Sequence, residues 1–103
     1  MGFRIKVIVE KVDGYCALGY KVGDSFVIER YYILPGNVKI CIHAFSAMLT
    51  LLSAFIHGVD ADKLGIGKDK DVGFLQCPDP GKPYTCGGTV LFKLIRERIE
   101  DSV

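Results

Sequence analysis

From residue 40 to residue 59 this 103-residue chain carries no Asp, Glu, Lys or Arg, and this uncharged run limits the fold more than any other feature. Asn37 is a suitable N-cap, because its side-chain oxygen can accept a hydrogen bond from an unpaired N–H of a first helical turn. Gly58 is a suitable residue to follow the last turn, since it adopts a left-handed conformation easily. The run therefore predicts one long helix over about residues 38–57.

The polar and apolar residues of this run separate onto different sides of the predicted helix. At about 100° per residue, the polar ones share one narrow stripe, made of His43, Ser46, Thr50, Ser53 and His57. The opposite arc, which we expect to face the core, holds Cys41, Phe45, Met48, Leu49, Leu52, Phe55 and Ile56. The polar stripe argues against a membrane-spanning helix. The wide apolar arc predicts a second covering layer, either a loop such as 59–67 or another subunit.

Alternating side chains predict strands on both sides of the helix. The segments with this character are 3–12, 25–33, 72–77 and 89–98. The last of them also fits helical spacing, but the alternation of Val90, Phe92 and Leu94 favours a strand. These elements predict an α+β fold, with a small, mostly antiparallel sheet of about four strands and one central packed helix. Residues 1–103 are expected to form a single domain.

The charge balance narrows the classes of partner. The chain has 13 Lys and Arg against 12 Asp and Glu, a formal net charge of +1, so no long-range field would attract DNA, RNA or an anionic membrane. We expect neither a nucleic acid nor a membrane as partner. The first residues lack the apolar stretch of a signal peptide, which predicts a cytoplasmic protein. Its four cysteines are then reduced thiols or metal ligands rather than disulfides.

Cys41 falls where two interpretations compete. In the first turn of the predicted helix, unpaired N–H groups and the helix dipole would favour the thiolate form. Cys41 also belongs to the apolar arc, where a buried cysteine behaves as a small hydrophobic residue. Both interpretations stay open.

Two further cysteines lie in short rigid segments. Cys16 belongs to a loop between Gly14 and Gly19, a setting in which metal sites present thiolates. Cys77 ends a predicted strand and opens a Pro-Asp-Pro loop, which is equally a stiff turn in which Asp79 bonds the backbone. No C-x2-C pair exists, so a site for zinc or iron would have to be assembled from distant segments. We predict Cys16, Cys41 and Cys77 as its ligands, with Cys86 a fourth ligand or part of a turn.

The histidines and the usual enzyme motifs add little. His43 and His57 lie too far apart along the predicted helix to bind one metal together, and each is expected at a surface or interface. The chain has no P-loop, no dinucleotide fingerprint, no H-E-x-x-H and no G-x-S-x-G. Enzymatic activity is therefore an open question, with a thiol-dependent reaction at Cys41 as the one form it would take.

Three motifs taken together resemble a small uncharacterised family of single-domain proteins from archaea and bacteria. They are the run from Gly14 to Asp24 that contains Cys16, the Cys41-x2-Ala44-Phe45 segment at the helix, and Cys77-Pro78-Asp79-Pro80. The resemblance implies three recurring cysteines, here Cys16, Cys41 and Cys77, and no assigned activity. The chain departs from the family pattern at Ile42 and His43, where the family has Pro and Trp. It departs again at Cys86-Gly87-Gly88, which looks like an insertion.

These observations favour a small binding module with a soft-metal or redox-responsive cysteine site. The alternative is a structural or interaction protein that forms a homodimer through its central helix, with its cysteines merely packed in the core.

Overall fold

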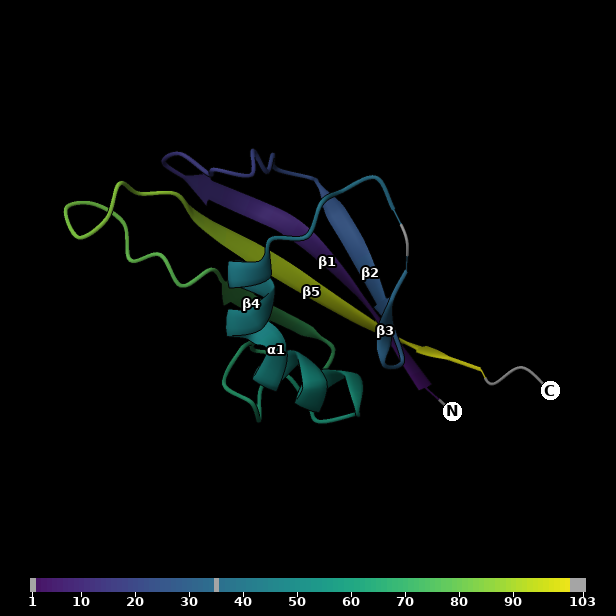
Figure 1. Cartoon of the computed structure of the whole chain (residues 1–103). Coiled ribbons are helices and arrows are strands. Elements are labelled where there is room, and N and C mark those ends of the chain that lie inside the picture. The colour runs from purple at the N-terminus through teal and green to yellow at the C-terminus, as the bar shows by residue number, and fades with distance from the viewer. Residues whose placement is uncertain (1, 35, 101–103) are drawn as a thin grey trace.

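The computed structural model describes residues 2–34 and 36–100, which form one antiparallel sheet with one helix across it (Figure 1). The elements are β1 (Gly2–Asp13), β2 (Ser25–Glu29), β3 (Tyr32–Ile33), α1 (Ile42–Ile56), β4 (Val72–Gln76) and β5 (Thr89–Ile99). The strand order is β3-β2-β1-β5-β4, so the two longest strands, β1 and β5, pair at the centre. The predicted α+β class is confirmed, and residues 89–98 belong to a strand rather than a helix.

The sheet has five strands rather than about four, because the chain turns within the segment 25–33. Glu29 pairs with Tyr32, and Arg30 and Tyr31 form the tight turn between β2 and β3. Arg30 has a φ of 55°, a left-handed conformation that glycine or asparagine adopts far more readily than arginine. The sequence therefore carries no recognisable turn signal at this point.

One face of the sheet forms the core. Ile5, Val7 and Val9 of β1 are buried there beside Phe92 and Leu94 of β5. This inward alternation is the one that the sequence pattern predicts, since successive side chains of a strand point to opposite faces. A bulge between Val9 and Lys11 shifts the register toward the end of β1.

The helix begins later than predicted. Its N-cap residue is Cys41 rather than Asn37, and the backbone of Cys41 is extended. The C-terminal prediction is confirmed, because Gly58 follows the last turn with a φ of 106° and donates its N–H to the carbonyl of Phe55. No helix in the described part of the chain, 2–34 and 36–100, is long and apolar enough to cross a membrane.

The helix also faces the core at a slightly different angle. Its buried residues are Ala44, Met48, Leu52, Phe55 and Ile56. Leu49, expected on the core arc, is 49% exposed, and Cys41 and Phe45 are only partly buried. The segment 59–67 packs against β4, because it buries Ala61 and Ile66 and the carbonyl of Ile66 accepts the N–H of Phe74. A second layer over the apolar flank of the helix stays a prediction.

Arg96 is a buried charge that the sequence pattern does not reveal. It occupies an inward position of β5 and is 3% exposed. Its guanidinium donates to the carbonyls of Phe55 and Val59 at the C-terminal end of α1 and to the carboxylate of Asp71. These contacts stabilise the helix end, where carbonyls lack intrahelical partners and the dipole favours a cation.

Candidate functional site

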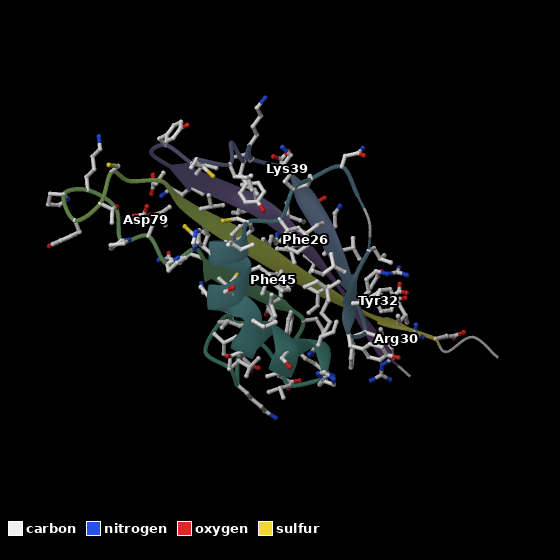
Figure 2. The ribbon with its side chains drawn as sticks, viewed as in Figure 1. Phe26, Arg30, Tyr32, Lys39, Phe45 and Asp79 are labelled. Atoms are coloured by element: carbon white, nitrogen blue, oxygen red, sulfur yellow. The ribbon has the colours of Figure 1, made fainter. Side chains whose placement is uncertain are left out.

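All four cysteines line one cavity of about 520 Å³. They come from separate segments: the loop 14–19, the start of α1, the end of β4 and the loop 82–88. The cavity lies where these segments meet, at the end of the sheet that carries the long loop after β4. Figure 2 places Asp79 in that loop, far from Arg30 and Tyr32 at the other end of the molecule. The volume of the cavity is in the usual range for small-molecule sites.

The first wall of the cavity contains Cys16. The loop that carries it is closed by a hydrogen bond from the N–H of Gly19 to the carbonyl of Cys16 at 2.9 Å. Gly88, from the loop before β5, approaches this loop so closely that a Cβ atom there would overlap the carbonyl oxygen of Tyr15. Gly88 also has a φ of 110°, which favours glycine. The glycine thus allows two distant loops to share one wall.

The second wall contains Cys41, which Tyr20 positions. The Tyr20 hydroxyl accepts the N–H of Cys41 at 3.0 Å and donates to the carbonyl of Lys39 at 2.8 Å. The ring of Tyr20 is buried and meets Phe92 edge-on, with centroids 5.7 Å apart. These two hydrogen bonds hold the chain before Ile42 in an extended conformation, which explains why the helix begins after Cys41.

The hydroxyl of Tyr20 has a raised pKa. Desolvation by burial is the main cause, the hydrogen bond from the Cys41 N–H lowers the pKa, and the negative charge of Cys41 and Cys16 in their thiolate forms would raise it further. No sequence signal singles out Tyr20 beyond its place next to Gly19.

The third wall contains Cys77, the most buried of the four cysteines. Its N–H donates to the carbonyl of Val90, and the N–H of Val90 donates back to the Cys77 sulfur at 3.2 Å. The thiol in turn donates to the carbonyl of Gly88 at 3.5 Å. Cys77 is thus engaged in the connection between β4 and β5, and its sulfur is held in place.

Asp79 fixes the loop that follows Cys77. One carboxylate oxygen accepts the N–H of Gly81 at 2.8 Å and the hydroxyl of Thr85. The hydroxyl of Thr89 donates to the Asp79 carbonyl at 2.7 Å. The hydrogen bond from Thr85, followed by that from Gly81, holds the pKa of Asp79 below its usual value. The interpretation of this segment as a stiff turn in which Asp79 bonds the backbone is confirmed.

The structure brings the predicted ligands Cys16, Cys41 and Cys77 to one cavity, together with Cys86 and His43. Within residues 2–34 and 36–100, however, no group of three or more His, Cys, Asp or Glu side chains is arranged closely enough to hold a metal ion. Thiolates that share one zinc lie roughly 4 Å apart, given Zn–S distances near 2.3 Å. The assignment of the three cysteines to zinc or iron stays a prediction. His57 lies apart from them and bonds the Ser53 carbonyl through Nδ1 at 2.7 Å.

No family model matches the chain, and no curated protein or solved structure is significantly similar to it.

Proposed function

We propose that this protein is a small binding module whose site is the cysteine-lined cavity and whose thiols make that site responsive to soft ligands and oxidants. One observation carries the proposal: every cysteine of the chain, although supplied by four separate segments, lines the same cavity. Cysteines that served only as small core residues would have no reason to gather in this way.

The lining of the cavity suggests the kind of ligand. The lining includes the buried side chains of Ala44 and Val90 and the buried ring of Tyr20. Among the described residues that line it, Asp79 is the only carboxylate, and none is a lysine or arginine. The lowered pKa of Asp79 keeps it charged at neutral pH. The cavity therefore suits a neutral or cationic molecule with an apolar body, and opposes an anion.

The arrangement favours thiols that act individually or in pairs over a ready-made metal centre. A zinc or iron site would require the sulfurs to move together, since the described side chains hold no group of metal-binding geometry. Elemental analysis of the purified, reduced protein tests the metal form directly. Stoichiometric zinc or iron that is lost in the Cys77→Ala variant would establish that form of the site.

Binding can be tested with N-phenyl-1-naphthylamine, an uncharged apolar dye that fluoresces when it leaves water. Ala17 lines the cavity but is exposed, so Ala17→Trp fills the cavity without disturbing the core. Ala47→Trp is the matched control, because Ala47 is exposed on α1 and lies outside this cavity. We expect saturable binding to the natural chain and to Ala47→Trp, and a loss of most binding in Ala17→Trp. Equal binding by all three proteins would contradict the proposal.

A second candidate function is supported by the outer surface of the helix. Ile42 is 72% exposed and Leu49 is 49% exposed, and these positions lie two turns apart on α1. Exposed apolar side chains on one helix are typical of an interaction surface. In this alternative the protein forms a homodimer through α1, and the cysteines are merely packed. Sedimentation velocity tests it: a dimer that Leu49→Glu dissociates would support the alternative, and a monomer at all concentrations would exclude it.

A further inference from the structure

Cys16 and Cys41 are both connected to Tyr20, Cys16 through the chain and Cys41 through a hydrogen bond. The loop of Cys16 ends in the turn at Gly19, directly before Tyr20, and Cys41 donates its N–H to the Tyr20 hydroxyl. The two residues are 25 positions apart, yet both line the same cavity as Tyr20. Tyr20 is buried, so this contact keeps the two segments next to each other, while the exposed part of the Cys16 loop can still move.

The four thiols differ in how accessible they are. Cys16 and Cys41 are partly exposed. Cys77 is buried, and its sulfur is engaged with Val90 and Gly88. Cys86 is exposed on the loop before β5. A reagent in solution therefore reaches Cys16 and Cys41 through the cavity, reaches the exposed Cys86 directly, and is obstructed from Cys77.

We propose that Cys16 and Cys41 form a modification site. The two thiols react with a low-molecular-weight disulfide by thiol–disulfide exchange, and the final product is an intramolecular disulfide between them. This inference rests on the proposed function, of which it names the reacting pair. It requires the loop of Cys16 to close toward the start of α1. The only covalent connection it adds is between those two segments.

The exchange balances in two steps. One protein thiol loses its proton and attacks a sulfur of the small disulfide, so that a protein–small-molecule disulfide forms and one small thiolate leaves. The second protein thiolate then attacks the protein sulfur of this mixed disulfide, which forms the Cys16–Cys41 bond and releases the other small thiolate. The two protein thiols lose two electrons and two protons, and the small disulfide gains them as two thiols.

The chain is well suited to mapping the product with trypsin. Cleavage after Lys and Arg places Cys16 on the peptide 12–21 and Cys41 on the peptide 40–63. Cys77 and Cys86 stay together on the peptide 71–93, because trypsin does not cleave Lys82 before Pro83. Each pairing therefore gives a different mass pattern.

The reduced full-length protein is incubated with cystamine, a small disulfide whose two ammonium groups suit this cavity. The protein is then alkylated to block the remaining thiols, digested without reduction and analysed by mass spectrometry. We expect the peptides 12–21 and 40–63 to be joined, with the whole protein lighter by two hydrogens before alkylation. The crosslink should survive in Cys86→Ser, and Cys41→Ser should carry cysteamine on Cys16 instead. A crosslink that involves the peptide 71–93, or only cysteamine adducts after long incubation, would overturn the inference.

The same reduced samples are tested with N-phenyl-1-naphthylamine. If the dye binds and Ala17→Trp abolishes its binding, but no Cys16–Cys41 crosslink forms, the binding module stands and the modification site fails. If the crosslink forms but the dye does not bind, the modification site stands and the binding module fails. Thermal unfolding provides a further check, because a disulfide that closes the loop between residues 16 and 41 restricts the unfolded chain and should raise the unfolding midpoint.

Discussion

The Tyr20 hydroxyl accepts the N–H of Cys41 at 3.0 Å and donates to the carbonyl of Lys39 at 2.8 Å. A buried side chain that follows the first cysteine loop thereby determines where the helix begins. The same contact brings Cys41 to the wall of the cavity that Cys16 also lines. The position of the helix start and the composition of the candidate site thus depend on one pair of hydrogen bonds.

The first prediction concerns a variant that lacks both hydrogen bonds of the Tyr20 hydroxyl. Tyr20→Phe keeps the edge-on ring contact with Phe92 but leaves the Cys41 N–H and the Lys39 carbonyl without their partner. We expect the free energy of unfolding to fall by about 1–3 kcal/mol, measured by urea denaturation. Tyr31→Phe is the control, since Tyr31 is largely exposed, and it should change stability by less than about 0.5 kcal/mol. Equal effects of the two substitutions would contradict the role assigned to Tyr20.

Arg96 allows a test of the helix end. Arg96→Met keeps much of the buried side-chain volume but removes the donors to the carbonyls of Phe55 and Val59. We expect a loss of about 2–4 kcal/mol in unfolding free energy, because the Val59 carbonyl loses this donor and the Phe55 carbonyl keeps only the N–H of Gly58. Arg98→Met, at an exposed position of the same strand, should cost less than about 1 kcal/mol. Similar losses in both variants would show that the contacts of Arg96 with α1 contribute little.

Alanine substitutions at two glycines distinguish the cost of a steric clash from the cost of backbone strain. Gly88→Ala would place a Cβ against the carbonyl of Tyr15, whereas Gly19→Ala meets no atom within 4 Å. Both have positive φ, so both should lose about 1 kcal/mol from strain. We expect Gly88→Ala to lose clearly more and to speed the alkylation of Cys16 and Cys77 by moving the loops apart. Matching stabilities and matching alkylation rates in the two variants would be incompatible with the close approach.

The lowered pKa of Asp79 predicts that the stability of the fold depends on pH. Its pKa is lower in the folded protein than its ordinary value of 3.8, so its contribution to stability is present above that value and is lost as the pH falls through the lower folded pKa. Thr85→Val removes the main cause of the shift. The natural chain should be more stable than Thr85→Val at pH 7, and the difference should shrink as the pH falls below 3.8. A difference that is constant over this range, measured by denaturant unfolding at each pH, would argue against the hydrogen bond as its source.

The central strands and the class of fold could be predicted because their signal is local. Ile5, Val7 and Val9 of β1 alternate with polar residues except at Ile8. In β5, Val90, Phe92 and Leu94 recur at every second position, which favours a strand although Leu91 and Ile95 between them are apolar. The end of the helix could be predicted for the same reason, since Gly58 provides a local stop signal.

The features that the sequence could not show depend on distant contacts. The helix start is determined by Tyr20, which lies 21 residues before Cys41 and has no sequence pattern linked to it. The turn at Arg30 has an arginine where turn chemistry favours glycine or asparagine. For the candidate site, the motifs identified the cysteines individually. Their approach to one cavity depends on loop contacts such as Gly88 against Tyr15, which only the tertiary structure contains.

The most direct test of the central claim is the alkylation rate of each cysteine, measured by mass spectrometry on the reduced protein with and without N-phenyl-1-naphthylamine. If the cysteine-lined cavity is a binding site, the dye slows alkylation of Cys16 and Cys41 several-fold in the natural chain and in Ala47→Trp, and has no such effect in Ala17→Trp. Unchanged rates at both cysteines in the presence of saturating dye would contradict the account.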